Sequence, residues 1–119
     1  MSTTILSNYL IVLFLGSTNL LWLTETDYDF GQVTYDTAVN IAFEYQNTGT
    51  DSLYIDNVRT SCGCTTSEWS YDAVAPDSVG VIHVSYDSRD MGNIKKKIKV
   101  YFKSIRKAHI LTIEGTVIE

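Results

Sequence analysis

The strongest constraint on the fold is an alternation of apolar with mainly polar side chains in residues 39–46. The apolar positions share one parity and the residues between them share the other: Val39, Ile41, Phe43 and Tyr45 against Asn40, Ala42, Glu44 and Gln46. Successive side chains of a β-strand point to opposite faces, whereas one face of a helix repeats every three or four residues. The pattern therefore predicts a strand with one buried face.

Shorter alternating runs follow along the chain, separated by turn-forming residues such as those at 47–52. Within the run that starts at Leu53, Val58 changes parity, which predicts a bulge or bend near Asp56 and Asn57. No helical period occurs beyond residue 23, so the chain is predicted to be an all-β sandwich. Its predicted core comprises Val39, Ile41, Phe43, Leu53, Ile55, Ile82, Val84, Ile98, Val100, Leu111 and Ile113.

The first 23 residues differ from the rest in their hydropathy pattern. Residues 9–15 form an apolar run of the length found in secretory signal peptides, although no Lys or Arg precedes it and no Ala-x-Ala follows. Gly16 to Asn19 interrupt the run, so no transmembrane span is predicted in the mature chain. We therefore expect a signal-peptide-like hydrophobic segment at 1–23, with a first strand as the alternative. The sandwich is expected at 24–119 and should fold when the chain begins at Thr24. The expected location is outside the cytoplasm, in the periplasm, the cell envelope or the extracellular space.

Charge is unevenly distributed along a chain of net charge −5. No Lys or Arg precedes Arg59, whereas eight lie between residues 89 and 107. Lys95, Lys97 and Lys99 fall on the polar parity of one predicted strand, and this pattern suggests a surface for an acidic protein partner. An ordinary solvated face is the alternative. The net negative charge argues against nucleic acid as the partner.

The motif Cys62-Gly63-Cys64 contains both cysteines of the chain. Gly63 allows the chain to bend enough for a disulfide, and a ring of this size is relatively easy to reduce. Two buried thiols, or a thiol-redox or thiophilic metal site such as one for Cu(I), are the alternatives. The histidines that could add a ligand, His83 and His109, lie in predicted strands, where a surface role is more common.

Several motifs occur in an order that resembles the bacterial domain-of-unknown-function family 1573. They are Asp29-Phe30-Gly31, the run at 43–49, Leu53-Tyr54-Ile55, Ser61-Cys62-Gly63-Cys64-Thr65, Pro76 before a strand, Gly92 before a lysine-rich strand, and the run at 111–115. Two departures concern turns: Asp77 stands where the family usually has Gly after Pro, and the strand around Phe102-Lys103-Ser104 lacks the family's usual Asn. The resemblance implies a single immunoglobulin-like β-sandwich of about seven strands, similar to Hydin-type and major-sperm-protein-like modules, in an exported or envelope protein without an assigned activity.

Catalytic motifs are missing from the sequence. It has no nucleophile elbow, no glycine-rich phosphate loop and no histidine motif. We therefore expect a non-catalytic binding or structural module of the bacterial cell envelope, without a cofactor. The alternative is a thiophilic metal (copper) or thiol-redox protein that acts through Cys62 and Cys64.

Overall fold

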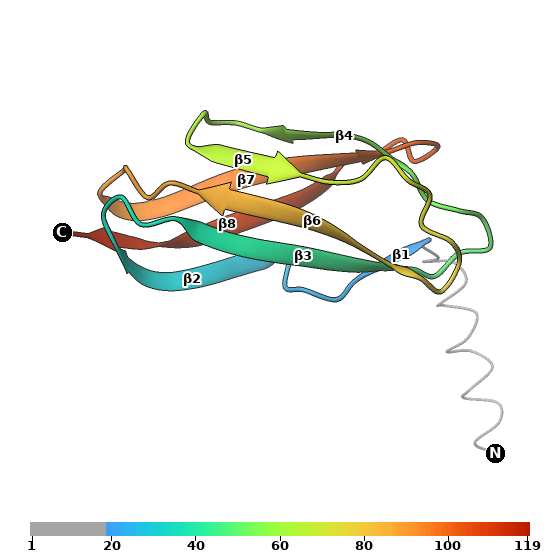
Figure 1. Ribbon diagram of the computed structural model, residues 1–119, viewed down its shortest axis with the longest axis horizontal. Helices are drawn as coiled ribbons and strands as arrows, with labels where there is room; N and C mark the ends of the chain where they lie inside the picture. The colour runs from blue at the N-terminus through green and yellow to red at the C-terminus, as the bar shows by residue number, and fades with distance from the viewer. Residues whose placement is uncertain (1–18) are drawn as a thin grey trace, which may run out of the picture.

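Residues 19–119 are described by the structure, a computed structural model, and they form two four-stranded sheets packed face to face (Figure 1). The first sheet has the order β1-β3-β6-β5, with β1 at Leu20–Trp22, β3 at Val39–Asn47, β6 at Val79–Tyr86 and β5 at Thr65–Glu68. The second has the order β2-β8-β7-β4, with β2 at Asp27–Thr34, β8 at His109–Ile118, β7 at Gly92–Phe102 and β4 at Ile55–Thr60. The predicted all-β sandwich is confirmed, with eight strands in the described residues. The two shortest strands, β1 and β5, are too short for the alternation of side chains to reveal them.

All strand pairs are antiparallel except β2 with β8, which run parallel. The register between β2 and β8 shifts between Asp29 and Gly31, where Gly31 has a φ of 77° and donates its N–H to Asp29 Oδ1 at 2.8 Å. A second shift between Ile55 and Asn57 in the β4–β7 pair is the bulge that the parity change at Val58 predicts. Both bulges lie on strands at the edges of the second sheet.

The core lies between the inner faces of the two sheets. All of the predicted core residues are buried except Val39, which is half-buried at the start of β3. Three aromatic side chains that the prediction omitted, Tyr45, Tyr86 and Phe102, are also buried there. Burial raises the pKa of Tyr45 to about 12, because its phenolate would lose hydration.

The sandwich begins earlier in the chain than expected. Leu20, Leu21 and Trp22 pair with the end of β3, and Leu20 is buried in the core. The boundary that the sequence suggests at Thr24 therefore lies four residues after the start of β1. The apolar run at 9–15 is outside the described residues, so the expected export signal stays a prediction. Within residues 19–119 we find no helix with the length and apolar character needed to cross a membrane.

Candidate functional site

The Cys-Gly-Cys turn lies where the chain crosses from one sheet to the other. β4 of the second sheet ends at Thr60, and β5 of the first sheet begins at Thr65. In the structure Cys62 and Cys64 form a disulfide, which is one of the alternatives left open by the sequence. The bond closes a ring within the turn, so it does not connect the two sheets to each other.

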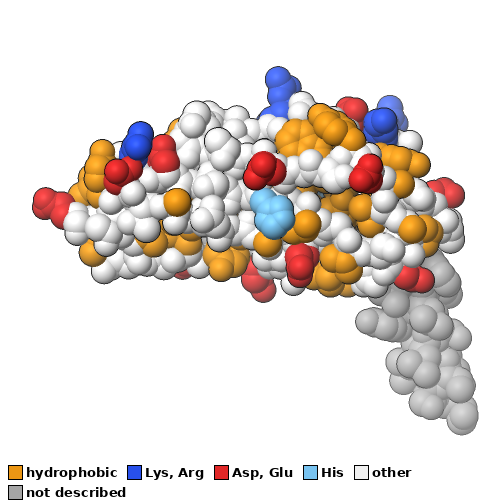
Figure 2. All heavy atoms as spheres, in the orientation of Figure 1, with side chains coloured by type: hydrophobic (Ala, Val, Ile, Leu, Met, Phe, Trp, Pro, Cys, Tyr) orange, Lys and Arg blue, Asp and Glu red, His pale blue; other side chains and the backbone are white. Residues whose placement is uncertain are grey.

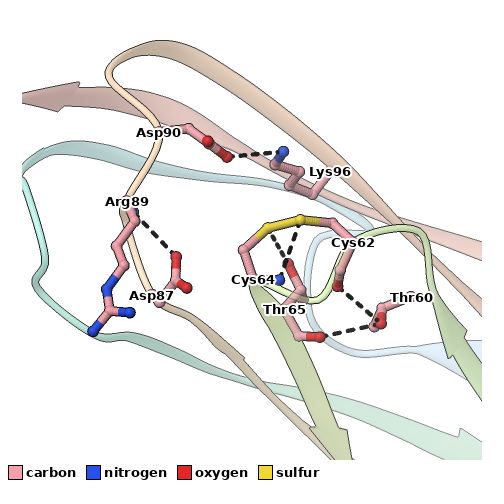
Figure 3. The surroundings of a disulfide bond; sticks show 8 residues. All are labelled: Thr60, Cys62, Cys64, Thr65, Asp87, Arg89, Asp90 and Lys96. Atoms are coloured by element: carbon pink, nitrogen blue, oxygen red, sulfur yellow. Dashed lines mark hydrogen bonds and ion pairs between the residues drawn. A yellow bond between two sulfur atoms is a disulfide. The ribbon is translucent and has the colours of Figure 1, made fainter.

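Backbone and hydroxyl groups hold this turn in place (Figure 3). Thr60 Oγ1 lies 3.1 Å from the carbonyl oxygen of Thr65 and 3.4 Å from that of Cys62, and donates across the turn. The N–H of Cys64 points at Cys62 Sγ at 3.2 Å. From the loop after β6, the N–H of Asp87 donates to the carbonyl oxygen of Cys64 at 3.0 Å. The position of the disulfide is thus fixed by hydrogen bonds from both sheets.

An ion pair lies against the disulfide. A carboxylate oxygen of Asp90 and the two sulfur atoms of Cys62 and Cys64 all lie within 4.8 Å of one another. The other partner of this carboxylate is Lys96, whose Nζ is 3.2 Å from Asp90 Oδ2 and whose side chain is only 22% exposed. Sequence reasoning missed Asp90 because it lies in a loop. The signal that could have found it is Lys96, which stands on the apolar parity of β7.

The two histidines do not approach the sulfurs as ligands. His83 lies on β6, exposed between Ala42 of β3 and Glu68 of β5. His109 begins β8, and its Nδ1 accepts a hydrogen bond from Trp22 Nε1 at 3.1 Å. Burial lowers the pKa of His109 and so favours the neutral ring that this bond requires. Among the described carboxylates and imidazoles, the third donor beside the sulfurs is therefore Asp90, a hard oxygen ligand that suits Cu(I) poorly.

The predicted partner-binding lysines share one face of β7. Lys95, Lys97 and Lys99 are exposed, and Arg59 of β4 lies directly opposite Lys99. Together with Thr60, Ser61 and Tyr101 they line a groove of about 540 Å³. The ion pairs within residues 19–119 are Arg89 with Asp36 and Lys96 with Asp90, so these four cations have none there. We call Arg59, Lys95, Lys97 and Lys99 the basic face. Arg59 escaped the sequence prediction because only the pairing of β4 with β7 brings it to the lysines.

The opposite side of the molecule differs in character. Figure 2 shows it with apolar and acidic side chains scattered among uncharged polar groups, and with Lys and Arg at a few places, mostly toward the upper edge. Val79 of β6 and Leu21 of β1 belong to the exposed apolar residues of the first sheet. The cluster of cations is therefore a local property of the β4–β7 face and does not extend around the domain.

The sandwich and its Cys-Gly-Cys turn can now be compared with known proteins. A family model described as "Protein of unknown function (DUF1573)" matches residues 21–117. The chain belongs to this family. The match begins within β1 and ends within β8, so it covers almost the whole described DUF1573 domain. A comparison with curated proteins finds no match.

Solved structures share the fold of this DUF1573 domain at low sequence identity. A protein of unknown function from Porphyromonas gingivalis W83 aligns with a TM-score of 0.70 at 17% identity, over 87% of this chain and 50% of that one. PapD-like domain 7 of human CEP192 gives 0.66 at 10% identity, over 87% of both chains. The C. elegans MSP family member WR4 gives 0.56 at 8% identity, over 86% of this chain and 100% of that one. These likenesses confirm the immunoglobulin-like sandwich, and the chain spans half the length of the Porphyromonas protein.

Proposed function

We propose that this DUF1573 domain is a non-catalytic binding module of the bacterial cell envelope, and that its basic face binds an acidic segment of a partner protein. The observation that carries the proposal is the set of four cations around one groove, without ion-pair partners in the described part of the chain. A groove lined by unpaired charges of one sign attracts a ligand of the opposite sign.

Folding alone does not account for this arrangement. Arg59 and Lys99 are cross-strand neighbours, and like charges in directly opposite positions destabilise a sheet. Lys95 is the cross-strand neighbour of Glu114 on β8, yet the two form no ion pair. Binding of an acidic partner would explain why like charges that repel each other in the free domain are placed side by side.

An acidic polypeptide fits the basic face better than a nucleic acid does. The basic face gathers four cations around one groove, whereas the whole chain carries a net charge of −5. A long polyanion would extend beyond the basic face, and the acidic side chains there would repel it. A short acidic segment can lie in the groove without such contacts. Tyr101 and Ser61 add hydroxyl groups that can donate hydrogen bonds to its carboxylates.

Export to the envelope is supported by the sequence. The apolar run at 9–15 has the length of a signal-peptide core, and it lies close before β1. An oxidising compartment would also maintain the disulfide between Cys62 and Cys64. We propose on these grounds that the domain acts outside the cytoplasm.

A titration with a fluorescent peptide rich in Glu tests the binding. In low salt we expect saturable binding, weakened about tenfold when Lys95, Lys97 and Lys99 are all replaced with Gln, because each exposed charge contributes up to about 1 kcal/mol. The matched control replaces Lys103, Arg106 and Lys107 with Gln, which changes the net charge equally at exposed sites outside the groove.

The two triple variants separate a site from a general charge effect. Equal weakening in both would show that only net charge matters and would overturn the proposal. Absence of saturable binding to the natural domain would do the same. A single-stranded oligonucleotide that binds more tightly than the peptide at the same salt concentration would replace the acidic protein with nucleic acid. Added salt should weaken the peptide complex, since exposed charges are screened over about 8 Å at physiological ionic strength.

A further inference from the structure

We propose that the Cys62–Cys64 disulfide is a redox site that accepts two electrons from thiols, by exchange with a dithiol protein or with two molecules of a small thiol. This inference is independent of the basic face. It concerns a stoichiometric exchange at the turn between β4 and β5, and it rests on the placement of the disulfide, its accessibility and the charged groups beside it.

A structural cross-link is a poor explanation for this bond. Its cysteines are two residues apart, and the stabilisation from a disulfide falls as the loop that it closes shortens. The bond joins no two strands. Hydrogen bonds from Thr60 and Asp87 already hold the turn to both sheets. Reduction would therefore leave the sandwich intact, which a reversible redox site requires.

The disulfide is also within reach of a reductant. Cys62 and Cys64 are both half-buried, Cys64 with part of its side chain against the core, and they lie in a turn at the border of the sandwich. Exposed disulfides are the labile ones, whereas buried disulfides resist reduction. A thiol can thus approach the bond without unfolding of the domain.

The hydrogen bond at 3.2 Å from the N–H of Cys64 to Cys62 Sγ favours one direction of exchange, because the contact of Cys64 Sγ with the Thr65 hydroxyl is longer, at 3.8 Å. An N–H that points at a sulfur stabilises the thiolate form of that sulfur. We therefore assign Cys64 Sγ as the atom attacked and Cys62 as the thiolate that leaves. The incoming thiolate forms a mixed disulfide with Cys64 as the bond between Cys62 and Cys64 breaks.

A second thiol then resolves the mixed disulfide and leaves Cys64 as a thiolate, and both cysteines take up protons from water. The protein disulfide gains two electrons and two protons, while two thiols of the reductant are oxidised to one disulfide. No other oxidant or reductant takes part.

The ion pair beside the disulfide sets the rate of the first step. The Asp90 carboxylate lies close to both sulfurs and repels an incoming thiolate, and the Lys96 ammonium bound to it offsets this repulsion. The two members of the pair therefore act in opposite directions on the attack. If the ion pair only held the structure of the turn, loss of Asp90 or of Lys96 would change the rate of attack in the same direction.

Equilibration with glutathione tests the redox site in the natural full chain. Free thiols are alkylated after incubation with reduced and oxidised glutathione in several ratios, and the fraction of reduced Cys62 and Cys64 is measured by mass spectrometry. We expect a smooth transition between oxidised and reduced forms in folded protein, with glutathione found on Cys64 in the trapped intermediate. A disulfide that stays oxidised in excess reduced glutathione until the protein is unfolded would overturn the proposal. Glutathione trapped on Cys62 would reverse the assigned direction.

Two single substitutions test the ion pair. Asp90→Asn should increase the rate of reduction by glutathione, and Lys96→Gln should decrease it, each about twofold to fivefold for partly exposed charges. Rates that shift in the same direction in both variants would show a merely structural pair and overturn this part. Circular dichroism of both variants before and after reduction verifies that the sandwich remains folded during the measurement.

Discussion

Trp22 Nε1 donates a hydrogen bond to Nδ1 of His109 at 3.1 Å, and the two residues are 87 positions apart in the chain. The bond connects the short first strand of one sheet to the first residue of the last strand in the other. The Trp22 ring also packs against Tyr45 and Phe102, with centroids 5.5 and 6.5 Å away. The first strand is therefore part of the packed sandwich and not a loose extension of it.

A chain that begins at Thr24 should be less stable than one that begins at Asn19, because it lacks β1 and the Trp22 ring. Trp22→Ala in the longer chain should lower the free energy of unfolding by about 2–3 kcal/mol, below the range for fully buried aromatics since Trp22 is half-buried. Urea denaturation of the three proteins measures these differences. Leu21→Ala is a matched control on the same strand, because its side chain is 52% exposed. Equal free energies of unfolding for the two chains would show that β1 does not stabilise the sandwich.

Stability should fall with decreasing pH through the titration of His109. Burial lowers the pKa of His109 in the folded protein below its ordinary value of 6.5. The stability that the neutral His109 ring contributes is fully present above pH 6.5. It is lost as the pH falls through the lower folded-state pKa, because the unfolded chain takes up the proton first. Protonation of Nδ1 would also remove the acceptor of the bond from Trp22. Denaturation midpoints between pH 7.5 and about pH 5 should decrease less in His109→Asn than in the natural protein.

Asn47 should be one of the most sensitive polar positions. Its side chain is fully buried, and Nδ2 donates to the carbonyl oxygens of Asp51 and Val74 at 2.8 Å each, while Oδ1 accepts from the N–H of Gly49 at 2.9 Å. Asn47→Ala would remove all three hydrogen bonds, although the carbonyl oxygen of Val74 would keep the one from the N–H of Leu53, and should cost about 2–4 kcal/mol in unfolding experiments. Gln46→Ala removes one more exposed bond to Asp77 and should cost less than about 1 kcal/mol. Similar costs at both positions would show that the Asn47 bonds are not needed for the turn.

Two substitutions at turn positions with positive φ should stabilise the domain. Asp77 and Ser104 have φ values of 68° and 69°, in the left-handed region where Gly and Asn are tolerated best. Asp77→Gly and Ser104→Asn should each raise the free energy of unfolding by up to about 1 kcal/mol. Asp51→Gly serves as the control, because Asp51 is not among the described residues with positive φ and glycine there only increases the entropy of the unfolded chain.

The strands and the core could be predicted from the sequence because each strand carries its own alternation of apolar and polar side chains. Period-two alternation in β3, β6, β7 and β8 directly reflects which face of each strand is buried. The bulge in β4 was also visible, as a parity change at Val58. In contrast, β1 was obscured by the apolar run before it, and nothing in a sequence indicates that β2 runs parallel to β8.

The candidate site was less accessible because it depends on contacts between distant segments. Arg59 joins the lysines only through the pairing of β4 with β7, and Asp90 reaches the disulfide only because the loop after β6 folds over the turn. The choice between a disulfide and free thiols also lay beyond the sequence, since it depends on how Gly63 bends the chain. Lys96 was the one local sign of this arrangement, a charged residue at an inward position.

In the second sheet β2 lies at the edge, and its hydrogen-bonded neighbour in residues 19–119 is β8. Asp27 pairs with Thr112, and Thr34 with Ile118. During synthesis, residues 27–34 are made long before β8, which is their pairing partner in the second sheet within residues 19–119. One edge of β7 also remains unpaired until β8 is made. Contacts of such long sequence separation slow folding. The second sheet of the nascent chain therefore cannot be completed until the last strand has been made, and during this interval unpaired strand edges remain open to a chaperone.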